Sequence, residues 1–424
     1  MAPWLALAVV VVVARWRWNQ LIDPQVPFVG WDAQVFQQIA ERPLGLDLVG
    51  SSKPLVVPLV YRAAHGDLPA VARIQAELAF AAWTILTITT ALVVRRGWVR
   101  ALAVGVGLSF LLEPVRVGFA SSMLPESIDD SLAALSIAGL LAVRRLHGGA
   151  RLAVASATGV VVLAWLFTRD TNLFIAVTAA GVAMVVWRGW RSRAAWALLA
   201  AVVATSGVVL WSTTVAHEQL PYQRNWRMCF TPRASYPMLN NIKLRVFPDE
   251  RDDLPTMLQH IPGVIPMVVD SPQLAPLQTW LVEDGPSTYA RWLVRHPVDR
   301  LRELIRHRWV VLAANVRAYM PGHWVPRSPS FRTLTSTRWI LTLLMLTAPL
   351  LLRRPRADPL CGVALCIVVS GLVGAVASYY GDATELARHC YGAGQQIVLG
   401  LVLAALAWMD RVQWHRRDGV RDQA

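Results

Sequence analysis

Acidic and basic side chains gather in a few short polar segments of this chain, and the first of them holds an isolated acid. Asp32 lies in the run from Gly30 to Ala40, directly before an amphipathic stretch. A carboxylate can act as a general base toward a hydroxyl group. Arginine binds phosphate through paired hydrogen bonds and stabilises the charge of a phosphate leaving group. An acid that meets arginines at one place would therefore suit the transfer of a sugar from a lipid-linked phosphate to a hydroxyl.

Three later segments supply both kinds of charge. They hold, in chain order, Glu113, Arg116, Glu126, Asp129 and Asp130, then Arg169 and Asp170, and last Asp382, Glu385, Arg388 and His389. Lys53 follows Asp32 within the first polar segment. Ionisable groups close to the ends of membrane spans are costly to place there and usually have a function. We therefore expect these segments to converge.

The elements that must position these residues are apolar helices. The chain has 424 residues, of which 55% are hydrophobic and 16% are charged, with a mean hydropathy of +0.42. Soluble domains carry about 25% charged residues, so the composition predicts an all-α, polytopic membrane protein. Apolar windows give about ten spans of a bilayer core about 30 Å thick. They cover 3–14, 76–94, 101–113, 128–143, 152–168, 172–187, 195–213, 335–352, 359–379 and 391–409.

The arginines give these spans a direction. The formal net charge is +14, and five connectors or ends around 95–100, 144–151, 188–193, 353–356 and 411–421 hold sixteen arginines. All five fall on one side if every span crosses, and the positive-inside rule makes that side cytoplasmic. Both termini are then cytoplasmic, and Asp32 faces outward. We expect a bacterial inner membrane as the location and the bilayer, rather than nucleic acid, as the partner of the basic residues.

Three regions are predicted along the chain. Residues 1–213 form a transmembrane module with a first outer loop at 15–75, residues 214–334 form a large outer loop, and residues 335–424 form a second transmembrane module with a basic tail. Residues 287–318 mix apolar residues and arginines at helical spacing, which is typical of amphipathic helices on a membrane surface, with a break near His296 and Pro297. The first span, 3–14, is short, and a secretory signal is its rival interpretation, although no basic start or cleavage site supports one.

Structural roles compete with the functional ones. Asp32 could cap the helix that begins at Ala33, and Asp129 and Asp130 could cap the helix behind them. Arg169 and Asp170 could pair within their turn, and Glu385 and Arg388 could pair across one helical turn. His389 could be a packing residue.

The sequence gives little evidence for a metal site or a disulfide. No His or Cys cluster has zinc spacing. A divalent ion held by Asp32 with Glu126, Asp129 or Asp130 remains an alternative without a motif behind it. Cys361 and Cys366 lie in an apolar span and should be packed thiols. Cys229 and Cys390 fall on the oxidising side and could form a disulfide.

Several of these segments together resemble a family, the GT-C membrane glycosyltransferases. The run from Gly30 to Ala40 is similar to their first outer loop, in which an aspartate precedes an amphipathic helix with an aromatic residue. The turn Thr168–Asn172 resembles their arginine-bearing turn, Arg295-His296-Pro297 resembles their His-Pro before a juxtamembrane helix, and 385–389 resembles their last outer motif. The likeness covers roughly 30–400, and the chain departs from the common pattern in having Asp-Ala at the first motif.

The resemblance implies an inverting glycosyltransferase of the cell envelope. Its donor would be a polyprenyl-phosphate sugar, with mannose and arabinofuranose both fitting, and its acceptor an outer glycan or glycolipid. Asp32 would be the general base, and Lys53, Arg169 and Arg388 would bind the donor phosphate. We predict that Glu126, Asp129, Asp170, Glu385 and His389 complete the substrate site. A transporter or flippase for a lipid-linked glycan is the alternative, but it would show inverted repeats and charges at the midplane. A non-catalytic scaffold fits the crowded charges less well.

Overall fold

Every regular element in the described part of this computed structural model is a helix. The structure describes residues 2–25, 27, 29, 32–51, 53–188, 192–215, 235–250, 254–255, 274–312, 342–349, 358–383 and 386–411. The first half holds α1 (Ala2–Leu21), α2 (Ala33–Ala40), α3 (Leu46–Val49), α4 (Val56–Ala63), α5 (Leu68–Val93), α6 (Gly97–Leu111), α7 (Pro114–Ala120), α8 (Glu126–Val143), α9 (Gly148–Leu166), α10 (Asn172–Val186) and α11 (Arg193–Val215). The second half holds α13 (Ser235–Asn241), the π-helix η2 (Ile242–Val246), α14 (Phe247–Asp249), α16 (Leu274–Glu283), α17 (Gly285–Arg295), α18 (Pro297–Arg306), α19 (Arg308–Leu312), α22 (Pro359–Gly381) and α23 (Leu386–Arg411).

Five of the described helices are long and apolar enough to cross a membrane, which is consistent with an α-helical membrane protein. They lie at Leu68–Val93, Gly148–Leu166, Ala195–Thr213, Pro359–Gly381 and Arg388–Arg411. A sixth span arises if α6 and α7, bent by 51° at their junction, count as one. The ten spans expected from the sequence are therefore found only in part.

The differences have physical reasons. α10 has 15 residues and reaches about 22 Å at 1.5 Å per residue, less than a bilayer core of about 30 Å. α8 begins with three acids in its first five residues. The expected span 335–352 lies mostly outside the described residues.

The first helix is longer than the predicted span 3–14. α1 continues to Leu21 because its two arginines are accommodated within it. Arg15 forms an ion pair with Glu77 of α5 and lies over the ring of Phe80, 4.9 Å from its centroid. Trp18 is buried beside the same ring, at 6.1 Å between centroids. Pairing with α5 thus lets the helix run on past its charges.

The core is a bundle in which α5 packs on α6 and α8, α8 on α9, and the hairpin of α22 and α23 on α10. Small residues let these helices approach closely. A Cβ at Gly374 would lie 2.4 Å from Cγ1 of Ile175, and one at Gly400 would lie 2.7 Å from Cγ2 of Val368. Glycine at these positions therefore sets the spacing between α22, α23 and α10.

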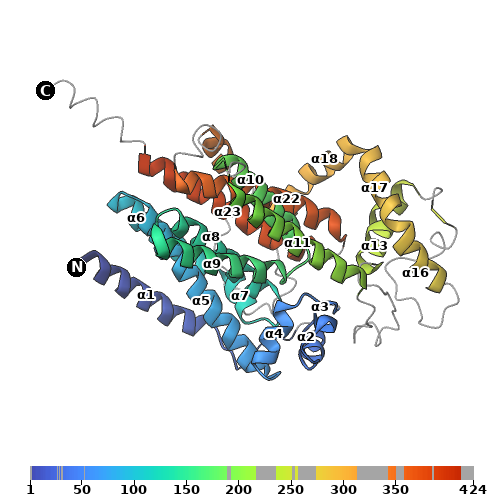
Figure 1. Cartoon of the computed structure of the whole chain (residues 1–424), viewed down its shortest axis with the longest axis horizontal. Coiled ribbons are helices and arrows are strands. Elements are labelled where there is room, and N and C mark those ends of the chain that lie inside the picture. Colours follow the sequence, from blue (N-terminus) through green and yellow to red (C-terminus); the bar gives the residue numbers. More distant parts are fainter. Residues whose placement is uncertain are drawn as a thin grey trace.

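The two ends of the bundle differ. The start of α1 and the end of α23 lie together at one end, which we call the terminal end (Figure 1). Arg411 binds Asp358 there at 2.8 Å, and the backbone N–H groups of Arg95 and Arg96 donate to Asp410. The arginine-rich connector after α5 thus lies beside the last turn of α23.

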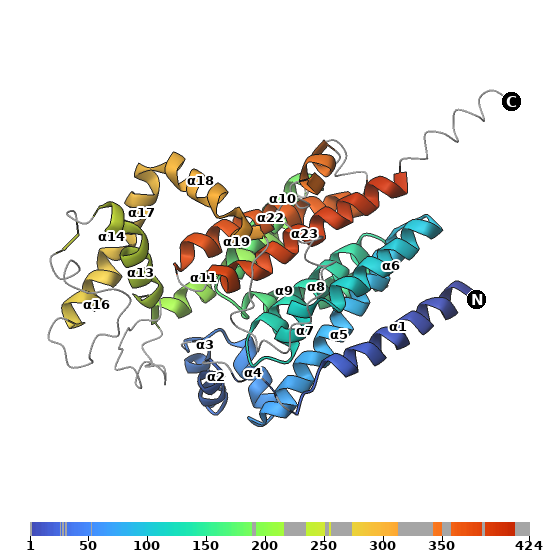
Figure 2. The ribbon, with the colours of Figure 1, turned by 180° about the vertical axis from the view of Figure 1, so that it is seen from behind.

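Helices α2, α3 and α4 lie at the opposite end, which we call the site end, with α13, α14, α16 and α17 further out (Figures 1 and 2). The predicted break near His296 is present, because α17 ends at Arg295 and α18 begins at Pro297.

Candidate functional site

Asp32 is held by two cations rather than by the helix behind it. It occupies the N-cap position of α2, yet its side chain makes no capping hydrogen bond. Lys53 Nζ donates to Oδ1 at 2.8 Å, and Arg388 Nη2 donates to Oδ2 at 3.1 Å. Both carboxylate oxygens therefore face cations from distant parts of the chain, and the structure contradicts a side-chain cap as the role of Asp32.

Glu126 joins two further cations to this group. Its Oε1 accepts from Nε of Arg388 at 2.6 Å and lies 3.6 Å from Nη1 of Arg169. Arg169 Nη2 lies 3.3 Å from Nδ1 of His389. Six of the nine predicted site residues thus form one connected group, the ion network: Asp32, Lys53, Glu126, Arg169, Arg388 and His389.

The local fold explains why these segments meet. α2 and α4 pack together through Phe36 and Tyr61, whose ring centroids lie 5.5 Å apart, and this places Asp32 beside Lys53. The backbone N–H of Val56 donates to the carbonyl of Phe167 at 3.1 Å, which ties the start of α4 to the connector that holds Arg169. Close packing of α23 in the bundle then brings Arg388 from the far end of the chain.

Asp129 lies next to the ion network and binds the residues around Arg169. α8 begins at Glu126 with Pro125 as its N-cap, so Asp129 and Asp130 are helical residues and not the expected caps. Oδ1 of Asp129 accepts from Trp165 Nε1 at 2.7 Å, Thr168 Oγ1 at 3.0 Å and Asn172 Nδ2 at 2.7 Å. Asp129 thereby fixes the turn that presents Arg169.

Asp130 belongs to a second buried ion group. Its carboxylate accepts from Arg116 Nε at 2.5 Å and Nη2 at 3.2 Å, and from Trp83 Nε1 at 2.8 Å. Glu113 lies on the other side, 3.3 Å from Arg116 Nη1. The guanidinium also stacks over the Trp83 ring, 3.8 Å from its centroid. These contacts join α5, α7 and α8 and hold the bend between α6 and α7.

The contacts above do not cover two of the predicted site residues. Asp170 follows Arg169 in the same turn and is half-buried. Glu385 lies outside the described residues, and with it the predicted pairing of Glu385 and Arg388.

The described residues bear on the metal alternative and on one partner of the predicted disulfide. Among the described residues, no group of three or more His, Cys, Asp or Glu side chains could hold a metal ion. Cys361 and Cys366 are buried free thiols of α22. Cys390 is also a buried free thiol, 3.9 Å from the carbonyl of Ala375. Its predicted partner Cys229 lies outside the described residues, so that disulfide stays a prediction.

The network carries a positive excess around an ionised acid. Lys53, Arg169 and Arg388 contribute three positive charges, and Asp32 and Glu126 contribute two negative ones. Burial by itself raises the pKa of Asp32, but the opposite charges of Lys53 and Arg388, with their hydrogen bonds, hold it well below its usual range. Among the described residues, the buried Oε2 of Glu126 has no hydrogen-bond partner. The five charged side chains therefore carry a formal charge of +1 and leave one carboxylate oxygen unpartnered.

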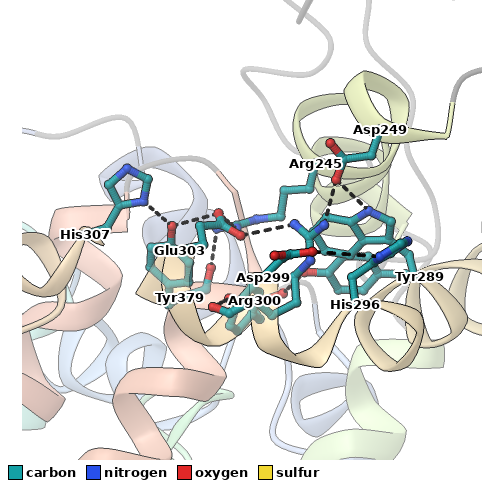
Figure 3. A network of polar contacts seen from close by, with 11 residues as sticks. Arg245, Asp249, Tyr289, His296, Asp299, Arg300, Glu303, His307 and Tyr379 are labelled. Carbon is teal, nitrogen blue, oxygen red and sulfur yellow. Dashed lines mark hydrogen bonds and ion pairs between the residues drawn. The ribbon is translucent and has the colours of Figure 1, made fainter. Parts of the chain in front are cut away.

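A separate polar network ties the outer helices to the end of α22 (Figure 3). Oε1 of Glu303 accepts from Arg245 Nη1 at 2.8 Å and from the Tyr379 hydroxyl at 2.9 Å. That hydroxyl lies 2.6 Å from Nδ1 of His307. Arg300 donates to Asp249 at 2.7 Å. We call Arg245, Asp249, Arg300, Glu303, His307 and Tyr379 the hinge network.

The hinge network was not predicted from the sequence, and only part of this network left a recognisable pattern there. The alternation of apolar and basic residues predicted an amphipathic helix, but not that Arg300 and Glu303 face inward. Arg245 lies in a π-turn, a feature often found at functional sites. Its partner Tyr379 sits in an apolar span more than a hundred residues later, so spacing along the chain could not reveal the contact.

No family model, curated protein or solved structure matches the chain. Any assignment of function therefore rests on the geometry described above.

Proposed function

We propose that the ion network is the active site of a membrane glycosyltransferase that takes a sugar from a polyprenyl-phosphate donor. One observation carries the proposal: a half-buried acid at a helix start makes no capping bond and instead faces Lys53 and Arg388. Cations that hold an acid in this way can bind a phosphate beside it. The acceptor is a glycan or glycolipid of the cell envelope, and the site end faces the extracytoplasmic side of a bacterial inner membrane.

The transfer is a single displacement at the anomeric carbon of the donor. The acceptor oxygen forms a bond to that carbon while the bond from the carbon to the phosphate oxygen breaks. The acceptor proton passes to Asp32, and the bonding electron pair leaves with the polyprenyl phosphate. Arg388, Arg169 and Lys53 stabilise the negative charge that grows on the phosphate. Attack from the opposite face inverts the anomeric centre.

The ion pairs of Asp32 also bear on timing. A carboxylate paired with two cations is a weak base, because the cations favour its ionised form. A bound donor phosphate competes for Lys53 and Arg388 and so returns basicity to Asp32. The Asp32 carboxylate is therefore a stronger base in the complex with the donor than in the free protein.

The test is sugar transfer by purified protein in liposomes from radiolabelled polyprenyl-phosphate mannose and arabinofuranose. Asp32→Asn keeps the shape of the side chain but removes the base. We expect it to lower the rate of transfer by about 10²–10⁴-fold, the usual contribution of a general base. Asp47→Asn is the matched control, because Asp47 is an exposed acid of the same connector, and it should transfer at the normal rate.

An unchanged rate in Asp32→Asn at normal protein levels would remove Asp32 from the mechanism. Movement of intact lipid-linked glycan across the liposome membrane without any transfer would instead support a flippase.

Arg388→Ala should raise the donor KM, because one charge-assisted contact contributes about 1.5–3 kcal/mol. Arg73→Ala, at an exposed arginine of α5, serves as its control.

A further inference from the structure

An exposed apolar stripe runs along α17, α18 and α19. Val298, Leu301 and Ile305 of α18 are spaced by three or four residues, which places them on one helical face, and Val294 of α17 and Trp309 of α19 flank them along the chain. In chain order, the exposed fractions of the five are 76, 57, 57, 54 and 57%. All five side chains, which we call the stripe, are therefore exposed, on both sides of the break at His296.

The opposite face of the same helices is packed and polar. Trp292 is fully buried, and Arg300 stacks on its ring at 3.6 Å from the centroid. Glu303 binds the Tyr379 hydroxyl, and the Tyr380 hydroxyl donates to the carbonyl of Arg300 at 2.7 Å. The hinge network thus fixes which face of α18 points outward, so the stripe is not the result of a free rotation of the helix.

The position of α18 matches the boundary of a bilayer. Tyr379 and Tyr380 belong to the last turn of α22, which is one of the apolar helices able to span a membrane. α18 binds α22 at the end of that span. Figures 1 and 2 both show α18 running across the direction of α22 and α23 rather than along it. An amphipathic helix in a membrane interface has this orientation.

The charges beside the stripe are basic. Arg291, Arg302, Arg306 and Arg308 are all exposed. Arg302 has a partner in Asp299 at 3.2 Å. Among the described residues, Arg291 and Arg306 have no ion-pair partner. Cationic residues that flank an apolar helical face favour binding to anionic lipid headgroups.

We propose that this stripe is immersed in the outer leaflet at the end of α22 and that Arg291 and Arg306 bind anionic lipid headgroups there. The occupant is the bilayer surface, since the same chain already places the end of α22 at that level. The lipid contact then holds α18 from one side while the hinge network holds it from the other. This lipid site is distinct from the ion network, and its test does not depend on sugar transfer.

The experiment measures the depth of single nitroxide labels in the full-length protein in lipid nanodiscs. Leu301→Cys and Ile305→Cys report on the stripe, and Asp299→Cys, at an exposed polar position of the same helix, is the matched control. Each carries Cys229→Ser, and the other native cysteines are buried. In discs of phosphatidylethanolamine and phosphatidylglycerol, collisions with oxygen relative to a water-soluble nickel chelate should be several-fold higher at 301 and 305 than at 299.

The arginine part of the proposal has its own arm. The oxygen-to-nickel ratio at 301 should fall in discs of phosphatidylcholine alone and in the Arg291→Gln/Arg306→Gln variant. An equal ratio at 299 and 301 would overturn immersion, and an equal ratio in the two lipids would overturn anionic binding. Spin–spin broadening at 301 between protein copies in discs would show a second copy on the stripe, which also overturns the proposal.

Discussion

At the scale of residues, the proposed function rests on which groups the two carboxylate oxygens of Asp32 bind. The same residue type at the same N-cap position serves elsewhere in this chain as a cap: Asp67 accepts from the N–H of Ala70 before α5, and Asp358 accepts from two N–H groups before α22. Asp32 makes no such bond and binds Lys53 and Arg388. Within one molecule, two carboxylates at N-cap positions thus cap their helices, and a third binds two cations instead.

A pH profile tests the electrostatics of Asp32. Burial raises its pKa, and Lys53 is the first of the two cations that lower it. Lys53→Met should therefore raise that pKa, by about 1–3 units, the usual effect of one close opposite charge. A base must be ionised to work, so kcat/KM for the donor, which reports the free enzyme, should be lost on acidification at a higher pH than in the natural protein. Lys53→Arg keeps the charge and should retain the original profile, and the same profile in Lys53→Met would show that Lys53 does not control Asp32.

The residue types of the site could be predicted from the sequence, but not all of their partners. Acids and arginines near the ends of apolar stretches pointed to Asp32, Glu126, Arg169 and Arg388. The role of Asp129 could not be predicted, because its donors Trp165, Thr168 and Asn172 lie in another helix and turn. A buried acid surrounded by donors and one surrounded by cations look alike along the chain.

At the scale of elements, the site depends on how closely α22, α23 and α10 pack. A methyl group at position 374 of α22 would clash with Ile175 of α10, so only glycine fits there. Asn172, at the start of α10, binds Asp129 next to the turn that holds Arg169. A separation of α22 from α10 would therefore move one side of the site relative to the other.

The packing prediction compares two glycines. Gly374→Ala should lower the free energy of unfolding by about 1–3 kcal/mol, the usual cost of overpacking. Gly181→Ala is the control in α10, because nothing lies within 4 Å of the added Cβ. It should raise stability by up to about 0.5–1 kcal/mol, since alanine favours a helix over glycine. Thermal unfolding in detergent measures both, and equal behaviour of the two variants would contradict the close approach.

The elements were only partly predictable. Hydropathy found the apolar helices, but it could not show that α1 runs past Arg15, because the neutralising Glu77 lies in another helix. At Glu113 and Pro114, where the span 101–113 was expected to end, the chain bends and continues as α7, in a segment that was expected to be a connector. Both outcomes depend on tertiary contacts that a window along the chain does not contain.

At the scale of the whole molecule, the ion network and the chain ends lie at opposite ends of the bundle (Figure 1). Asp358 and Arg411 close the hairpin of α22 and α23 at the terminal end, while Arg388 joins the ion network at the site end. Arg95, Arg96 and Arg145, which belong to two of the arginine-rich connectors, lie at the terminal end, because Arg95 and Arg96 donate to Asp410 and Arg145 donates to the carbonyl of Val93.

Cysteine labelling tests this polarity in cells. Asp47→Cys places an exposed thiol at the site end, and His147→Cys places one in the connector between α8 and α9. A membrane-impermeant maleimide added to intact cells should label position 47 and leave position 147 unlabelled until the membrane is opened. Labelling of 147 but not 47 would invert the proposed orientation. Both variants carry Cys229→Ser, and the Cys229→Ser protein alone measures the background, because its other three cysteines are buried.

The separation of the site's cations along the chain sets an order of events during synthesis. Lys53 follows Asp32 by 21 residues, whereas Arg388 follows it by 356. The ribosome therefore supplies the first partner of the acid almost at once and the second only when nearly the whole chain has been made. Until then Glu126 also lacks its Arg388 contact, 262 residues away. A nascent or prematurely ended chain accordingly holds Asp32 with one of its two cations and Glu126 without Arg388.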